Sequence, residues 1–254
     1  MGNKTSEIKP SRFGLIGRRL DYSFSKSYFE EKFTHLQLPH YSYTNIVCKD
    51  DAELAEFFSK KIHQYKGVNV TIPYKEKVIP FLDQLDRSAK KVGAVNTIVV
   101  KKGVLTGYNT DVYGFQTALI PFMSKPIPKA LIFGTGGAAK AVKYALEEMH
   151  ISLQQVSRNP TKTALSYVDL DAKLLESHLL LVNCTPVGTY PNLREMLPIP
   201  MQYISKKHLV FDLIYNPEES LLLKKARDKG ATTINGLTML QNQADKAWEI
   251  WNNV

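Results

Sequence analysis

Several features are scarce or absent in this chain of 254 residues, and each absence excludes a class of protein. No apolar run approaches the ~20 residues that span a bilayer, and the polar N-terminus lacks the apolar stretch of a signal peptide. The chain has two cysteines, Cys48 and Cys184, and no CxxC spacing. Disulfide frameworks and zinc sites need more cysteines at closer spacing. We therefore expect a cytoplasmic protein with no membrane segment and no bound metal.

Acidic residues are fewer than basic ones, which gives the chain a formal net charge of +9. Such an excess is typical of proteins that bind nucleic acid or small anions. The lysines occur as scattered doublets, such as Lys60-Lys61 and Lys206-Lys207, rather than in one segment with interleaved aromatic residues. Scattered doublets indicate a solvated surface. We expect a small anionic ligand and no nucleic-acid partner.

Short apolar runs alternate with helix-period segments along the whole chain. The expected strands cover residues 13–17, 41–47, 67–71, 95–100, 104–108, 130–133, 152–157, 179–183, 209–213 and 232–234. The expected helices cover residues 26–36, 52–62, two segments within 75–92, then 110–122, 138–149, 218–229 and 239–251. The strands at 95–100 and 104–108 predict a hairpin. Strand–helix alternation predicts parallel sheets covered by helices on both faces.

A polar segment with two prolines, residues 124–128, is the best candidate for a linker between domains. The alternation of strands and helices begins again after it. We therefore expect a first domain over residues 1–123, a second over residues 124–236, and a C-terminal helix over residues 237–254.

The strand expected before Gly134 runs directly into a glycine-rich turn and then a helix. This is the Rossmann dinucleotide-binding fingerprint in its proper context. Gly134 permits the tight turn, Gly136 allows the backbone to approach a pyrophosphate, and Ala139 stands where close helix–strand packing is needed. Gly137 and Ala138 open the helix, whose N-terminus attracts phosphates. The alternative is an ordinary strand–helix turn.

The next strand ends without an acidic residue. An Asp or Glu at that place accepts a hydrogen bond from the ribose 2′-hydroxyl of NAD. Here the chain has Arg158 instead, with Lys162 four residues on. An arginine can stack on adenine and pair with the 2′-phosphate of NADP, so the pattern favours NADP over NAD. The alternative is a solvated basic turn.

Polar residues of the first half stand beside the expected strand ends. If the chain is extended there, Ser23 and Ser25 point to one side and can hold a carboxylate. Lys75 follows a strand, and Asp111 begins a helix. Taken singly, Ser25 is an ordinary helix cap, Lys75 a solvated lysine and Asp111 an aspartate that favours the helix dipole.

Together these segments resemble the shikimate dehydrogenase family over nearly the whole chain. The matching motifs are Ser23-x-Ser25, Asn69-Val70-Thr71-x-Pro73-x-Lys75, Gly93-Ala94-Val95-Asn96-Thr97, Gly107-x-Asn109-Thr110-Asp111, Gly134-x-Gly136-Gly137-Ala138-Ala139, Asn183-x-Thr185-x-x-Gly188, Asp212-x-x-Tyr215-x-Pro217 and Gly236-x-x-Met239-Leu240-x-x-Gln243-Ala244.

The resemblance implies two open α/β domains, an N-terminal substrate domain and a C-terminal NADP-binding Rossmann domain, with a cleft between them. It implies reduction of 3-dehydroshikimate to shikimate with NADPH, in a monomer or homodimer. Lys75 and Asp111 are similar to the family's catalytic pair. The implied substrate ligands are Ser23, Ser25, Thr71, Asn96, Tyr215 and Gln243. The implied cofactor ligands are Gly134, Gly136, Gly137, Ala138, Arg158, Lys162, Thr185 and Gly236.

Two stretches depart from the family pattern. Residues 26–30 replace a proline and a His-Asn pair, and Thr189 replaces a methionine where the nicotinamide would lie. Two alternatives to the main hypothesis stay open. One is a relative that also oxidises quinate, or prefers it, with NAD. The other is a dinucleotide-binding regulatory protein that has lost catalysis, against which the presence of both Lys75 and Asp111 argues.

Overall fold

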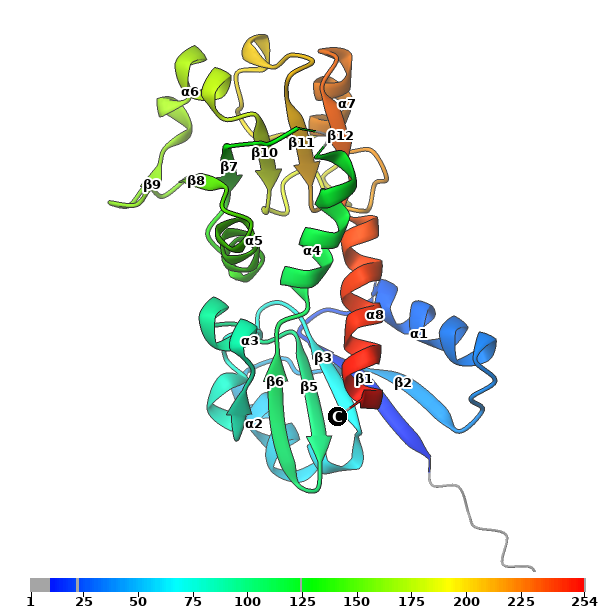
Figure 1. Cartoon of the computed structure of the whole chain (residues 1–254). Helices are drawn as coiled ribbons and strands as arrows, with labels where there is room; N and C mark the ends of the chain where they lie inside the picture. The colour runs from blue at the N-terminus through cyan, green and yellow to red at the C-terminus, as the bar shows by residue number, and fades with distance from the viewer. Residues whose placement is uncertain (1–9, 22, 124, 254) are drawn as a thin grey trace, which may run out of the picture. The chain divides into compact units, whose positions relative to one another are not determined.

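The computed structural model describes residues 10–253 apart from Tyr22 and Ser124 (Figure 1). The polar N-terminal stretch and the first residue of the expected linker lie outside the described residues. The chain forms two compact units. One runs to Asn109 and also takes in the chain from Ala247 onward, and the other comprises Thr110–Lys246. The domain limits expected from the sequence stay a prediction.

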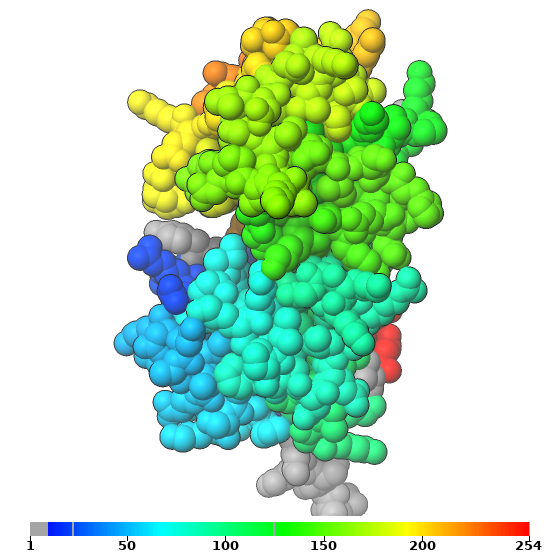
Figure 2. Space-filling model, turned by 90° about the vertical axis from the view of Figure 1, so that its left-hand side faces the viewer, coloured from blue at the N-terminus to red at the C-terminus, as the bar shows by residue number. Residues whose placement is uncertain are grey.

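The first unit is built on a six-stranded sheet in the order β2-β1-β3-β5-β6-β4. Its strands are β1 (Ser11–Gly17), β2 (Tyr41–Val47), β3 (Gly67–Val70), β4 (Gln84–Leu85), β5 (Thr97–Lys101) and β6 (Val104–Tyr108). β1 is parallel to β2 and β3, whereas β5 is antiparallel to β3 and β6. The predicted hairpin is confirmed as β5 and β6. In Figure 2 the segments coloured blue to cyan-green form the visible surface of this unit.

The helices of the first unit are α1 (Phe24–His35), α2 (Asp51–Lys60) and α3 (Arg87–Val92), with 3-10 turns η1 (Ile62–Gln64) and η2 (Ile79–Phe81). Of the two short helices expected within residues 75–92, the second is α3, whereas the first is only the 3-10 turn η2 and is followed by the unexpected strand β4. Pro80 limits the first helix to one turn. The Asp83 carboxylate then accepts a hydrogen bond from Leu105 N–H at 2.7 Å, which draws the segment to the sheet.

The second unit is a parallel sheet of six strands in the order β12-β11-β10-β7-β8-β9. Its strands are β7 (Lys129–Phe133), β8 (Ser152–Val156), β9 (Ala164–Leu165), β10 (Leu180–Asn183), β11 (Leu209–Asp212) and β12 (Thr232–Ile234). The chain winds outward from β7 in one direction and from β10 in the other. The crevice at such a switch point, beyond the carboxyl ends of the strands, is where doubly wound sheets bind ligands.

The helices that belong to or enter the second unit are α4 (Asp111–Leu119), α5 (Gly137–Glu148), α6 (Ala172–Ser177), α7 (Leu221–Asp228) and α8 (Leu237–Asn253). Three 3-10 turns complete it, η3 (Ile120–Phe122), η4 (Tyr167–Asp169) and η5 (Met201–Tyr203). The helix expected to reach residue 122 becomes a 3-10 turn after Leu119, where Pro121 lacks the N–H that an α-helix needs. Among the described residues, none of these helices is long and apolar enough to cross a membrane.

The last turns of α8 pack in the first unit through an indole ring. Trp251 lies 4.8 Å from the ring of Phe13, and its Nε1–H donates to the carbonyl of Ile98 at 3.0 Å. The ring occupies the space in which a side chain at Gly67 would lie. The absence of a side chain at this buried β3 position therefore makes room for the C-terminal helix.

Gly67→Ala should destabilise the protein by about 1–3 kcal/mol, because a methyl group overpacks the site that the Trp251 indole fills. Chemical denaturation would measure the loss. In a Trp251→Phe background the smaller ring leaves room, so the same substitution should cost less. An equal cost in both backgrounds would contradict the contact.

Candidate functional site

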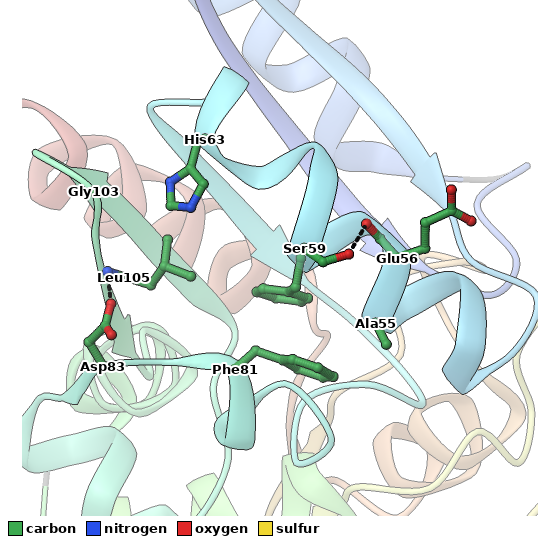
Figure 3. A pocket seen from close by; sticks show the side chains of 9 residues that line it. Ala55, Glu56, Ser59, His63, Phe81, Asp83, Gly103 and Leu105 are labelled. Atoms are coloured by element: carbon green, nitrogen blue, oxygen red, sulfur yellow. Dashed lines mark hydrogen bonds between the residues drawn. The ribbon is translucent and has the colours of Figure 1, made fainter.

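The residues expected to bind substrate do not line the pocket shown in Figure 3. This pocket of about 580 Å³ lies in the first unit, and its described lining is Ala55, Glu56, Phe58, Ser59, His63, Phe81, Asp83, Gly103 and Leu105. Its floor is apolar, with Phe58 and Phe81 stacked at 4.8 Å. None of the predicted ligand residues is among them. The predicted ligand residues lie instead near the ends of strands, such as Thr71 after β3 and Thr185 after β10.

The carboxyl ends of β1 and β3 hold a group of the expected substrate residues. Thr71 N–H donates to the Ile16 carbonyl at 2.9 Å, which ties the chain after β3 to β1. Asn96, 2% exposed, stands directly before β5, and its carbonyl accepts from the Val70 N–H at 2.8 Å. Thr71 and Asn96 are therefore fixed by main-chain hydrogen bonds at one edge of the sheet.

The backbone of Ser23 is extended, but that of Ser25 is helical, so the two serines do not share the extended segment that the alternating pattern requires. Ser23 is the N-cap residue of α1, and Ser25 is already within the first turn of the helix. The side chain of Ser23 makes no capping hydrogen bond, and its buried Oγ has no hydrogen-bond partner among the described residues. Side chains two residues apart point to the same side of a strand but not of a helix. The alternating pattern therefore does not predict the relative directions of these two hydroxyls.

A buried chain of side chains connects Tyr43 to Asn96. The Tyr43 hydroxyl donates to Asn69 Oδ1 at 2.8 Å. Asn69 Nδ2 donates to Thr97 Oγ1 at 3.1 Å, and that hydroxyl donates to Asn96 Oδ1 at 3.2 Å. Burial raises the pKa of Tyr43 strongly, so its hydroxyl stays protonated. The network therefore provides hydrogen-bond partners for the side chain of Asn96, an expected substrate ligand.

Lys75 is half-buried on a loop that is held on both sides. Its carbonyl accepts from Val95 N–H at 2.7 Å. The preceding Tyr74 is fully buried, and its hydroxyl donates to the Cys48 carbonyl at 2.6 Å. The guanidinium of Arg18 lies 5.9 Å from the centre of the Tyr74 ring. These contacts fix the backbone at Lys75, and therefore the point from which its side chain extends.

Asp111 begins α4 and is 6% exposed. The neighbouring Thr110 hydroxyl donates to Gln243 Oε1 on α8 at 3.4 Å. The two helices approach closely at Gly114, where an added methyl group would lie 2.6 Å from the Met239 carbonyl and 3.0 Å from Gln243 Cβ. Asp111 and Gln243, far apart in sequence, thus belong to one cluster of the second unit. Lys75 belongs to the first unit, so its pairing with Asp111 stays a prediction.

The glycine-rich turn lies between β7 and α5. Gly134 has φ +112°, a left-handed conformation that favours glycine, and its N–H donates to the Val156 carbonyl at 2.9 Å. Gly136 is the N-cap of α5, with no side-chain cap and no atom within 4 Å of where its Cβ would lie. Gly137 and Ala138 open the helix, and Ala139 is fully buried. An open, uncapped helix N-terminus fits a phosphate group.

Arg158 and Lys162 are both exposed on the loop after β8. The positive charge of Arg158 is close enough to lower the pKa of the Tyr167 hydroxyl, although burial has the larger, opposite effect. The Tyr167 ring stacks on Phe133 of β7, with centroids 6.0 Å apart. Arg158 therefore stands beside the carboxyl end of β7, on the side of the sheet where the glycine-rich turn lies.

Thr185 is held by a buried network at the end of β10. Its N–H and its hydroxyl both donate to Asn183 Oδ1, at 2.9 and 2.8 Å. Asn183 Nδ2 donates to Asp212 Oδ1 at 2.9 Å, and the Ser220 hydroxyl donates to Asp212 Oδ2 at 2.6 Å. The hydroxyl proton of Thr185 is therefore donated within the protein. The Thr185 methyl group faces Gly134 and lies 3.2 Å from where a Cβ on that glycine would stand.

Comparison with known proteins places the chain in a family. Residues 15–98 match the model of the shikimate dehydrogenase substrate binding domain. A shikimate dehydrogenase (NADP(+)) of Clostridium botulinum is 39% identical over 249 residues, which cover 94% of this chain and 95% of the relative. The chain belongs to the shikimate dehydrogenase family.

Solved structures of this family have the same fold. Shikimate 5-dehydrogenase of Thermus thermophilus, in complex with NADP(H) and shikimate, is 29% identical, with a TM-score of 0.82 and coverage of 96% of this chain and 94% of that one. Quinate dehydrogenase of Corynebacterium glutamicum, in complex with NAD, is 27% identical, with a TM-score of 0.84 and coverage of 97% and 95%. The expected fold class, two open α/β parts with a dinucleotide-binding C-terminal half, is confirmed.

The remaining predicted residues of this family member lie around the end of β11. Tyr215 is half-buried, and burial raises the pKa of its hydroxyl. Gly236 N–H donates to the Ile214 carbonyl at 2.9 Å, and a side chain at Gly236 would collide with the Leu213 carbonyl. Thr189, which departs from the family pattern, donates its hydroxyl to the Asn216 carbonyl at 3.0 Å. Thr189 thus ties its own loop to the loop that carries Tyr215.

Several residues that carry the buried networks had no assigned role in the sequence. Asn69, Asn183 and Asp212 stand inside motifs, at the last positions of β3, β10 and β11 or next to them. A polar residue ending an otherwise apolar strand is the signal that could have identified them. Tyr43 had no such signal, because tyrosine is common on amphipathic strands.

Burial raises the pKa of Asp212 from 3.8 to about 6, against the lowering effect of hydrogen bonds from Ser220, Ile214 and Asn183. Between those pH values the folded protein holds a proton that the unfolded chain has released. Stability should therefore fall as pH rises through this window, by about 3 kcal/mol at ~1.4 kcal/mol per pKa unit. Denaturation of the wild type and of Asp212→Asn from pH 4 to 7 would measure the difference.

The stability advantage of the wild type over Asp212→Asn should shrink across that range. Ser220→Ala removes a hydrogen bond that lowers the pKa of Asp212, so it should extend the loss of stability to higher pH. A difference between wild type and Asp212→Asn that stays constant with pH would contradict the burial effect.

Proposed function

We propose that this protein is an NADP-dependent shikimate dehydrogenase, which reduces 3-dehydroshikimate to shikimate with NADPH. The observation that carries the proposal is the 39% identity to a curated shikimate dehydrogenase (NADP(+)) over nearly the full length of both chains. The presence of Lys75 and Asp111 in their motifs supports a catalytic rather than a regulatory member. The substrate is a small molecule, and a cytoplasmic monomer or homodimer stays a prediction.

NADP fits the residues of the second unit. The open N-terminus of α5 at Gly136 and Gly137 would receive the pyrophosphate. The loop after β8 offers the cations Arg158 and Lys162 to a 2′-phosphate and has no acidic residue where NAD-specific proteins bind the ribose. Ala138 lies at the same helix N-terminus, and the Thr185 methyl group faces Gly134 of the preceding turn. Gly236 is the remaining expected cofactor residue. The basic composition of the chain is consistent with attraction of anionic ligands.

Reduction of a ring ketone requires a hydride at carbon and a proton at oxygen, and NADPH supplies the hydride. Lys75 is the residue to which we assign the proton. Its loop is anchored at Tyr74 and at the Lys75 carbonyl, which fixes the backbone that carries the side chain. Asp111 would accept a hydrogen bond from a substrate hydroxyl and orient Lys75. Asn96, Thr71 and Gln243 would bind the other ring hydroxyls, and Tyr215 would lie near the carboxylate.

Lys75→Ala should lower turnover by roughly 10²–10⁴-fold, the usual contribution of acid–base catalysis. NADPH affinity should stay within a few-fold of the wild type, because Lys75 lies outside the expected cofactor residues. Lys77→Ala is the matched control, since Lys77 is exposed and pairs with Asp51 at 2.7 Å. Near-normal turnover in Lys75→Ala would contradict the assignment.

Cofactor preference depends on Arg158 in this proposal. With 3-dehydroshikimate, the wild type should oxidise NADPH far more efficiently than NADH. Arg158→Ala should raise the KM for NADPH by about 10–100-fold, as expected for loss of a charge-assisted hydrogen bond, and should affect NADH much less. Arg227→Ala removes the same charge from α7, where Arg227 pairs with Glu219, and serves as the control. Equal use of both cofactors would contradict this prediction.

Quinate oxidation is the second candidate activity. The similarity to a quinate dehydrogenase that was solved with NAD favours it. Steady-state kinetics with shikimate and quinate, each with NADP⁺ and NAD⁺, would separate the two activities. A regulatory member without catalysis would bind NADPH and turn over none of these substrates.

A further inference from the structure

A buried carboxylate in the second sheet has no assigned role in the proposed reaction. Asp212 is the last residue of β11 and is 0% exposed. Its Oδ1 accepts hydrogen bonds from Asn183 Nδ2 at 2.9 Å and from the Ile214 N–H at 3.1 Å, and its Oδ2 accepts from the Ser220 hydroxyl at 2.6 Å. Among the described residues, no lysine or arginine forms an ion pair with it. The carboxylate therefore holds three different segments of the chain through hydrogen bonds.

Asn183 connects Asp212 to the glycine-rich turn. Because its Nδ2 donates to the carboxylate, its Oδ1 accepts from both the N–H and the hydroxyl of Thr185, at 2.9 and 2.8 Å. The Thr185 oxygen in turn accepts from the Val187 N–H at 3.3 Å. The Thr185 methyl group faces Gly134. Two successive hydrogen bonds thus lead from Asp212 to a residue that packs against the turn.

Ile214 connects Asp212 to a second expected cofactor residue. The Gly236 N–H donates to the Ile214 carbonyl at 2.9 Å. A side chain at Gly236 would collide with the Leu213 carbonyl, so the two segments are in direct contact. The Leu213 N–H donates to the Asn183 carbonyl at 3.0 Å, which ties this segment to the end of β10 as well. Asp212 therefore holds the segments of both expected cofactor residues.

Ser220 fixes the orientation of the carboxylate itself. It is the N-cap residue of α7, is 1% exposed, and its Oγ accepts from the Leu223 N–H at 3.3 Å. Its proton is donated to Asp212 Oδ2. The other carboxylate oxygen is left to the two groups that lead to Thr185 and Gly236.

We propose that Asp212 is a positioning residue for NADP(H), which holds Thr185 and Gly236 in place before the cofactor binds. This inference rests on the proposed function, because it concerns the cofactor of that reaction. Asp212 is buried, and it acts on the cofactor only through the residues it holds. A site whose parts are already ordered binds more tightly than one that its ligand must order.

Binding of NADPH to the full chain, followed by the fluorescence of the cofactor, tests the proposal. Asp212→Ala should raise the Kd for NADPH by about 10–100-fold, because the two segments must then be ordered when the cofactor binds. Asp212→Asn should raise the Kd several-fold less. The amide oxygen of that variant can still accept from Asn183 and Ile214, and its nitrogen can donate to the Ser220 hydroxyl, which is able to accept.

Two results would overturn the proposal directly. One is a Kd of Asp212→Ala that equals that of the wild type. The other is an Asp212→Asn variant that binds NADPH as weakly as Asp212→Ala, because the charge of the carboxylate rather than its hydrogen bonds would then matter.

His208→Ala is the matched control for loss of stability. His208 directly precedes β11, at the opposite end of that strand from Asp212, and is 3% exposed. Its Nδ1 accepts from the Ser205 N–H at 3.1 Å, and its Nε2 lies 3.0 Å from the Leu175 carbonyl. The substitution should lower the melting temperature and leave the Kd for NADPH unchanged. A rise in Kd equal to that of Asp212→Ala would overturn the specific role of Asp212.

Two substitutions of Thr185 decide the proposal if Asp212→Ala does not fold. Thr185→Val keeps a methyl group toward Gly134 and loses the hydroxyl that donates to Asn183, whereas Thr185→Ser keeps the hydroxyl and loses the methyl group. Positioning by hydrogen bonds predicts weaker NADPH binding in Thr185→Val than in Thr185→Ser. Equal binding or the reverse order would overturn the proposal.

The proposed function and this inference fail in different ways. A wild type that binds no NADPH would contradict the proposed function, and this inference with it. A wild type that binds NADPH and reduces 3-dehydroshikimate, with variants in the wrong order, would contradict this inference alone.

Discussion

Polar side chains buried at the carboxyl ends of the strands must find their hydrogen bonds inside the protein, and the candidate site depends on this constraint. In the first unit Asn69, next to the end of β3, accepts from Tyr43 and donates to Asn96 and Thr97. In the second unit Asn183, at the end of β10, accepts from Thr185 and donates to Asp212. Each amide is buried, and both its oxygen and its nitrogen have hydrogen-bond partners. Each therefore determines which hydrogen bonds its neighbours can still make with a ligand.

The consequence for function is that a residue's position in a motif does not establish its chemical role. Thr185 stands where a cofactor ligand is expected, yet its proton is given to Asn183. Ser25 stands where an extended carboxylate ligand is expected, yet it lies within the first turn of α1. Thr185 can shape a site without being its donor. Among the residues expected to bind the cofactor, the backbone amides at the start of α5 and the cations on the loop after β8 are the groups that suit its phosphates.

Much of the fold could be predicted from the sequence. The alternation of apolar runs predicted parallel sheets, as in the second unit, whereas the antiparallel β5 of the first unit departs from that prediction. The family resemblance implied two open α/β domains, and the Gly134 turn predicted a strand followed by a helix. The strand β4 between the two short helical elements was not predicted, because the Asp83–Leu105 hydrogen bond draws this segment to the sheet and local periodicity cannot report a distant partner. The short elements β9 and α6 were not expected, since two-residue strands and short helices leave little pattern.

The candidate site was less predictable than the fold. Motifs identified residues such as Lys75, Asp111 and Gln243, and the structure brings Asp111 and Gln243 into one cluster through Thr110 and Gly114. Donor and acceptor directions could not be predicted, because they depend on contacts such as Tyr43 to Asn69 between residues far apart in sequence. The helical backbone at Ser25 was missed for a related reason, since a serine pair is compatible with both a cap and an extended segment.

The measurement that tests the central claim most directly is hydride transfer itself. NADPH carrying deuterium on the reactive face of C4 would be incubated with the protein and 3-dehydroshikimate, and the product would be examined by mass spectrometry and NMR. We predict shikimate with one deuterium at the former ketone carbon. Absence of shikimate, or shikimate without deuterium from either face of the labelled cofactor, would contradict the claim.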